Sequence, residues 1–106
     1  MTNVQIVQAM KHSKAYIINR LKQIKPSLQK RYPISEMALF GSVARDDHAD
    51  TSDIDILVDF NGAIGMGFFK LVNELEDEFQ TKVDVVSRKG IKPHYLPYVE
   101  GSLIRI

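Results

Sequence analysis

The chain has 106 residues, which is enough for one small domain with a single hydrophobic core, and we expect residues 1–106 to form that domain. Its formal net charge of +1 gives no general attraction to nucleic acid or to an anionic membrane, and we expect it to bind neither directly. The lack of cysteine excludes disulfides and thiolate zinc sites, and the lack of a secretory signal or an apolar run of roughly 20 residues predicts a cytoplasmic protein.

The first part of the chain is predicted to be helical from residue 4 to about residue 31, because its apolar residues recur at spacings of three and four. We expect a break near residues 11–13, where that spacing slips, which would leave residues 1–13 as an N-terminal helical extension. Pro26 should end, kink or restart the helix, because proline lacks the backbone N–H and disfavours a helical residue before it.

The rest of the chain is predicted to alternate between strands and helices. The second strand has the clearest pattern, since apolar residues alternate with Asp53, Asp55 and Asp59 in a period of two. Strands are expected at 37–40, 52–60 and 82–87, with a terminal edge strand at 103–106. Helices are expected near 43, at 68–79, and from about 93 to 101. This order predicts an α/β or α+β domain with a small sheet of three to four strands.

Asp53 and Asp55 are the first candidate site residues. Side chains alternate along a strand, so residues two apart share one face. Two like charges this close repel each other, and a divalent cation would remove that cost. Carboxylate oxygens favour Mg²⁺, with Mn²⁺ as an alternative. The other interpretation is a solvated strand face carrying two acids without a function.

Asp84 interrupts a segment that otherwise has the character of a core strand. Aspartate is a poor strand former, and an unpaired carboxylate there would cost several kcal/mol. If this strand lies beside the second, Asp84 can join Asp53 and Asp55. Three carboxylates around a metal suit phosphoryl or nucleotidyl transfer, because the third can accept a proton from an attacking hydroxyl. The alternative is an ion pair of Asp84 with Lys82 or Arg88 at a strand edge.

Gly41 and Ser42 are the candidates for binding phosphate. Glycine lets an anion approach the backbone, and Ser42 can cap the following helix, whose N-terminus offers free N–H donors. Arg45 lies one turn further on and could face the same way. The alternative is a helix cap and nothing more. The chain lacks both the G-x-x-x-x-G-K-[ST] and the G-x-G-x-x-G nucleotide motifs.

Taken in order, residues 39–45, 52–58 and 82–86 resemble the three motif segments of the nucleotidyltransferase superfamily of the DNA polymerase β type. The short length is similar to its minimal members, the MNT proteins, which are commonly encoded beside a HEPN-domain toxin. The resemblance implies a small mixed β-sheet backed by helices and transfer of a nucleoside monophosphate to a hydroxyl with release of pyrophosphate. In the antitoxin branch, AMP from ATP is added to a tyrosine of the HEPN toxin.

The resemblance also implies residue roles. Gly41 and Ser42 match the phosphate-binding pair, Asp53 and Asp55 match the metal-binding acids, and Asp84 matches the third carboxylate. These three aspartates would be both catalytic residues and metal ligands, and Arg45 would help to bind the nucleotide. Many relatives follow the arginine with glycine where this chain has Asp46, so the turn there could differ.

Two alternative functions stay open: an antitoxin that masks its partner by contact alone, and a nucleotidyltransferase for a small molecule of the aminoglycoside type. A homo-oligomer or a hetero-oligomer would fit each function. Among the aromatic residues, Phe68 and Phe69 could line an adenine pocket or meet a partner, or else anchor a helix to the core. Tyr95 is expected to pack.

Overall fold

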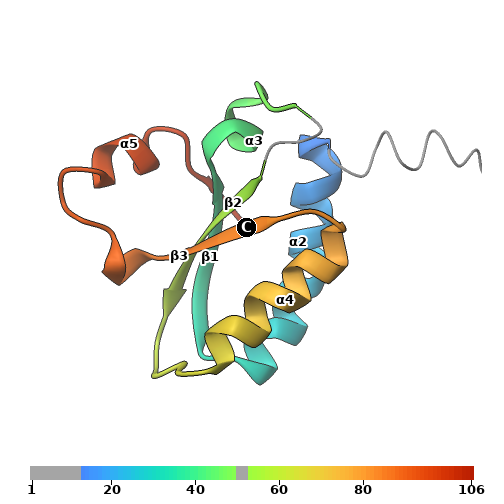
Figure 1. Ribbon diagram of the computed structural model, residues 1–106, viewed down its shortest axis with the longest axis vertical. Coiled ribbons are helices and arrows are strands. Elements are labelled where there is room, and N and C mark those ends of the chain that lie inside the picture. The colour runs from blue at the N-terminus through green and yellow to red at the C-terminus, as the bar shows by residue number, and fades with distance from the viewer. Residues whose placement is uncertain (1–12, 50–52) are drawn as a thin grey trace, which may run out of the picture.

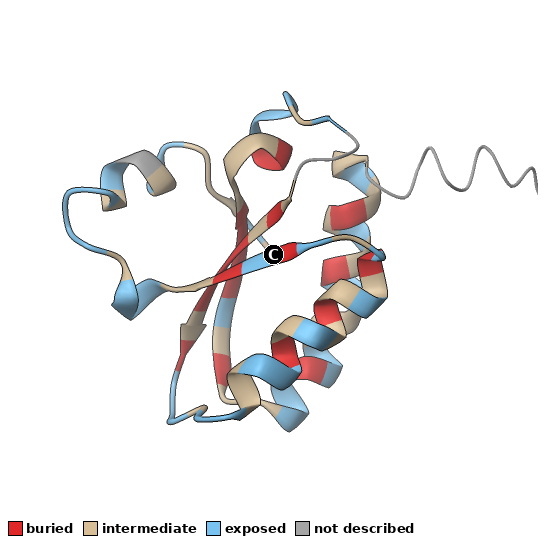
Figure 2. Cartoon of the chain, in the orientation of Figure 1, coloured by how far each residue is buried: buried red, intermediate tan, exposed pale blue. Residues whose placement is uncertain are grey.

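The computed structural model describes residues 13–49 and 53–106 (Figure 1). Two helices, α2 (Lys14–Arg31) and α4 (Gly67–Phe79), lie side by side against one face of a sheet, and α5 (Leu96–Glu100) lies on the other side (Figure 1). The core forms between the sheet and the two long helices, whose buried residues face the strands while their outer surfaces stay exposed (Figure 2).

The described residues form a four-stranded mixed sheet of order β3-β2-β1-β4. Its strands are β1 (Ile34–Phe40), β2 (Ile54–Phe60), β3 (Val83–Ser87) and β4 (Ile104–Arg105). β2 and β3 are parallel, whereas β1 is antiparallel to both β2 and β4. A parallel pair requires a crossover, and α4 supplies it. The predicted α+β fold, with a small mixed sheet backed by helices and a terminal edge strand, is therefore confirmed.

Helix α2 begins after Ser13, whose side-chain oxygen accepts a hydrogen bond from the Tyr16 backbone N–H at 3.1 Å. The helix then continues through Pro26 to Arg31, so the expectation that proline would end or restart it was wrong. Buried side chains on both sides of Pro26, Leu21 and Leu28 among them, hold the helix against the sheet, and this packing outweighs one missing hydrogen bond. The part of the predicted helix at residues 4–12 lies outside the described residues.

Charged side chains join α2 to α4 on the surface. Arg31 and Tyr32, at the end of α2, both donate to the Glu74 carboxylate, with Nη1 and Oη each 2.8 Å from Oε2. Arg20 forms a second ion pair with Glu78. These bonds hold α2 and α4 together in the helical layer that packs on one face of the sheet.

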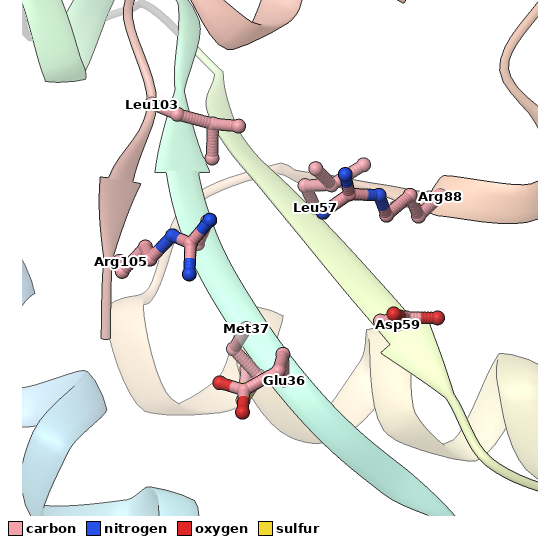
Figure 3. A pocket seen from close by; sticks show the side chains of 8 residues that line it. Glu36, Met37, Leu57, Asp59, Arg88, Leu103 and Arg105 are labelled. Atoms are coloured by element: carbon pink, nitrogen blue, oxygen red, sulfur yellow. The ribbon is translucent and has the colours of Figure 1, made fainter.

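The chain after β3 crosses the other face of the sheet. It runs through a 3₁₀ turn, η1 (Arg88–Gly90), and through α5 before it returns as β4. Leu57 faces this side and is buried beneath the segment. A small hollow of about 50 Å³ remains over Leu57, with Arg88 on the β3 side and Arg105 on the β4 side (Figure 3). Within the part of the chain that is described, every helix is too short or too polar to cross a bilayer.

Candidate active site

Asp55 lies at the meeting point of three strands. It is the register partner of Phe40 on the antiparallel strand β1 and of Asp84 on the parallel strand β3. Phe40 is followed directly by Gly41, which starts α3 (Gly41–Arg45). The structure therefore brings together the predicted glycine motif and two of the predicted aspartates, which come from distant parts of the sequence.

Gly41 is in direct contact with the Asp55 carboxylate. A methyl group on Gly41 would overlap Asp55 Oδ2 and lie 3.0 Å from Asp55 Cγ. The φ angle of Gly41 is +73°, in the left-handed region that glycine adopts without strain. Glycine is thus required here twice, by the backbone conformation and by the space that the carboxylate occupies. The side of Gly41 that would carry a Cβ faces Asp55, and the binding of phosphate by the Gly41 backbone stays a prediction.

The electrostatics of Asp55 reflect this placement. Partial burial raises its pKa from the ordinary 3.8 to about 6, and the negative charges of Asp84 and Asp53 contribute in the same direction. The positive charge of Arg45 acts in the opposite direction. Asp84, Asp53 and Arg45 therefore all lie within electrostatic range of Asp55. A divalent cation bound here would favour the ionised form of Asp55, and carboxylate oxygens are ligands of the kind that such an ion takes.

Asp53, just before β2, is partly exposed and lies beside Lys82, with 4.0 Å between Oδ2 and Nζ. Lys82 is therefore close to Asp53, whereas one alternative had predicted a pair with Asp84. Among residues 13–49 and 53–106, no three histidine or acidic side chains are gathered closely enough to hold a metal ion in this arrangement. The assignment of Asp53, Asp55 and Asp84 as a joint ligand set remains a prediction.

Helix α3 is only five residues long and is held by the buried side chains of Val43 and Ala44. Its N-cap is Phe40, without a side-chain hydrogen bond, and Ser42 lies inside the first turn. The idea that Ser42 caps the helix was therefore wrong, because the helix starts at Gly41, two residues before the expected start at Val43. The position still leaves the Ser42 hydroxyl and the first backbone N–H groups at the end of β1, since the first N–H groups of a helix have no partner within it.

Arg45 and Asp46 complete the turn after α3. Arg45 is exposed, and its Nε lies 3.2 Å from Asp47 Oδ2. Asp46 has a φ angle of +61° and ends the helix in the left-handed conformation. Glycine suits this conformation best, and aspartate is among the few other residues that adopt it readily. The departure from the family pattern at this position thus still permits a left-handed turn.

A larger hollow of about 220 Å³ opens beside Gly41, and α5 forms part of its wall. Among the described residues, its lining includes Phe40, Gly41, Arg45, Tyr95, Val99 and Ser102. Tyr95 was expected to pack, but 56% of it is exposed. Sequence reasoning missed the part that α5 plays in this site, because nothing in the local pattern of residues 93–101 says which end of the sheet the helix will reach.

The sequence profile of the nucleotidyltransferase domain family matches residues 21–105. The chain belongs to this family. The matched region contains Gly41 together with Asp53, Asp55 and Asp84, so the family match and the geometry concern the same part of the molecule.

Known proteins similar to this nucleotidyltransferase include a protein of Methanocaldococcus jannaschii that is provisionally named a protein adenylyltransferase. The two sequences are 37% identical over 84 residues, covering 78% of this chain and 83% of that protein. A solved structure described provisionally as a minimal nucleotidyltransferase superposes with a TM-score of 0.75 and 29% identity, covering 89% of this chain and 96% of the other. A chain from the complex of a tri-AMPylated Shewanella oneidensis HEPN toxin with an MNT antitoxin shares the fold, with a TM-score of 0.56, 20% identity and coverage of 92% and 70%.

The aromatic residues near the start of α4 lie at the end of the nucleotidyltransferase sheet opposite to α3 (Figure 1). Phe68 packs against the core and meets Phe60 edge to face, with ring centroids 6.4 Å apart. Phe69 and Met66 are 61% and 74% exposed. This placement favours a helix anchor for Phe68 and does not favour an adenine pocket at this position.

Proposed function

We propose that this nucleotidyltransferase transfers AMP from ATP, with Mg²⁺, to the hydroxyl of a protein tyrosine. One observation carries the proposal: Asp55 is in register with Asp84 and in contact with Gly41. In this arrangement an acidic oxygen lies beside the start of α3, where the first N–H groups have no partner within the helix. Mn²⁺ is the alternative cation for the same oxygen ligands.

Each residue would have a separate role. Asp53 and Asp55 would hold the cation, which when bound supplies positive charge to offset that of the phosphates. The backbone N–H groups at Gly41 and Ser42 would position the phosphates, and Arg45 would add positive charge. The acceptor hydroxyl oxygen would attack the α-phosphorus, pyrophosphate would leave, and Asp84 would accept the hydroxyl proton. Asp84 is exposed, which leaves room for an acceptor to approach it.

The proposed acceptor is a HEPN-domain toxin, which would make the chain an antitoxin. The proposal is supported by the name of the Methanocaldococcus jannaschii relative and by the HEPN complex in which the same fold occurs. We further propose that residues 1–106 act as a single minimal domain in the cytoplasm. The chain covers 96% of the solved minimal nucleotidyltransferase, so its size agrees with that of a protein of this type.

The test uses the purified chain, Mg²⁺, ATP labelled at the α-phosphate and the product of the adjacent gene. We expect label on the partner, and we expect Asp55→Asn to remove it. Asp59→Asn is the matched control, because Asp59 lies on the same strand four residues further on, at the other end of the sheet. Its variant should transfer label at the wild-type rate.

The two rival functions give different results in the same experiment. A toxin neutralised equally well by the Asp53→Asn, Asp55→Asn double variant, without labelling, would contradict the enzymatic proposal and favour a binding-only antitoxin. Labelling of an aminoglycoside but of no protein would favour the small-molecule enzyme. Removal of Mg²⁺ with a chelator should stop the transfer, and added Mn²⁺ should restore it.

A further inference from the structure

The hollow of about 220 Å³ beside Gly41 is lined by residues from two separate segments of the chain, the turn at α3 and the segment at α5. Gly41 and Arg45 form one side and belong to the proposed phosphate-binding turn. Tyr95 and Val99 form another side, contributed by α5 and the residue before it. Pockets that bind whole drug-sized ligands measure roughly 300–1,000 Å³, so this hollow suits one part of a nucleotide better than all of it.

Tyr95 is a largely exposed aromatic residue in the lining of this hollow. The residue is 56% exposed, and the ring of its neighbour His94 lies beside its own, with centroids 4.2 Å apart and planes tilted by 39°. Its backbone is held on both sides: its N–H donates to the Lys92 carbonyl at 3.0 Å, and its own carbonyl accepts from Val99 at 3.2 Å. An aromatic side chain on a hydrogen-bonded turn, beside a hollow, is well suited to stacking against a planar ligand.

From this arrangement we infer that the hollow binds the base of the nucleoside triphosphate, with Tyr95 as the surface on which the base stacks. The inference rests on the proposed function, because a triphosphate held at Gly41 and Arg45 brings its base to the adjoining wall. Phe40 and Val99 add apolar surface, and Ser102 adds a polar group to the lining.

The chemistry of the lining also indicates which nucleotides are accepted. Phe40 and Tyr95 are the aromatic residues of the lining. Stacking on aromatic side chains distinguishes bases by the size of their π-system more than by their edge groups. We therefore assign the substrate class as purine nucleoside triphosphates. ATP and GTP should bind with similar affinity, and CTP and UTP should bind more weakly.

The test separates the base from the phosphates. The affinity of the whole chain with Mg²⁺ is measured by calorimetry for ATP, GTP, CTP and inorganic tripolyphosphate. Tyr95→Ala should weaken ATP and GTP about tenfold or more and leave tripolyphosphate unchanged. Tyr95→Phe keeps the ring and should bind ATP as the wild type does. Phe69→Ala removes another exposed aromatic side chain, far from the hollow, and should change nothing.

Each alternative result has a definite meaning. Equal ATP binding by the wild type and Tyr95→Ala would overturn the base site while leaving the proposed function standing. An equal loss for ATP and tripolyphosphate in Tyr95→Ala would also overturn it, because the residue would then act on the phosphates or on the fold. Equal affinity for ATP and CTP would overturn the assignment to purines. A wild-type chain that binds no nucleotide would overturn the proposed function and this inference together.

Discussion

Asp55 and Asp84 are register partners on two parallel strands, so their carboxylates occupy neighbouring positions at the same end of the sheet. In a parallel pair this juxtaposition is set by the crossover, here α4, which returns the chain to the edge of β2. Gly41, the residue directly after the other neighbouring strand, borders Asp55. The site thus depends on the order of three strands, and four predictions follow from its geometry and from that of the helices behind it.

Asp55→Asn should stabilise the metal-free protein at pH 7.5. The pKa of Asp55 is raised by folding to about 6 from its ordinary 3.8, so ionisation opposes the folded state. The protonated form of Asp55 is the one that the folded state favours. The stability that it contributes is fully present below about pH 4 and is lost as the pH rises through about 6. After allowance for solvent screening, the gain in the variant should be about 1 to 2 kcal/mol at pH 7.5 and near zero at pH 4. Urea unfolding at both pH values measures it.

The same experiment with Mg²⁺ provides the control. Added cation should stabilise the wild type at pH 7.5 and should stabilise Asp55→Asn less, because the variant lacks the charge that the cation neutralises. A variant that is less stable than the wild type at pH 7.5 without metal would contradict the unfavourable environment assigned to this carboxylate.

Gly41→Ala should lower both stability and activity. Alanine at a φ angle of +73° costs about 1 to 2 kcal/mol, and its methyl group would in addition displace the Asp55 carboxylate. Gly65→Ala separates the two effects, because Gly65 has a φ angle of +53° but open space around it. Thermal unfolding should show a larger loss for Gly41→Ala than for Gly65→Ala, and only Gly41→Ala should reduce AMP transfer. An equal loss of stability in both variants would show that the methyl group of Gly41→Ala does not displace Asp55.

Asp84→Asn should reduce the rate of AMP transfer about 100-fold or more without lowering stability, if the residue accepts the proton of the acceptor hydroxyl. Its side chain is exposed, so the amide leaves no buried group unpaired, and it removes a negative charge that acts on Asp55. The rate at saturating ATP, measured beside the Asp59→Asn control, tests this. Unchanged transfer would assign Asp84 an electrostatic role at most.

Tyr32→Phe should destabilise the fold by about 1 kcal/mol, since it removes one partly buried hydrogen bond to Glu74. Burial and that bond raise the pKa of Tyr32 above its ordinary 10, while the Arg31 guanidinium, followed by Tyr32, lowers the pKa of Glu74. The tyrosine contribution should therefore be lost at strongly alkaline pH and the Glu74 contribution at acid pH. The free energy of unfolding of the variant is measured at pH 7, together with its rate of AMP transfer. Lower stability with an unchanged rate would support a purely structural role for Tyr32, and a lower rate would contradict it.

Local pattern was sufficient for much of the fold and for part of the site. The period of two in β2 places Asp55 on the face opposite the buried Ile54 and Ile56, whatever the rest of the chain does, because side chains alternate along any strand. The spacing of three and four in α4 likewise predicts which of its residues meet the sheet, and Leu71 and Leu75 do so. Such patterns are determined by backbone geometry alone.

Tertiary structure decided everything that required a register or a long-range contact. Whether Asp84 would face Asp55 depended on the pairing of β2 with β3, and one residue of slip would have moved it to the other face. The contact between Gly41 and Asp55, the exposed ring of Tyr95 and the continuation of α2 through Pro26 likewise arise from packing between segments distant in sequence. Local propensities amount to about 1–3 kcal/mol, whereas burial of several large side chains amounts to more, so packing prevails where the two conflict.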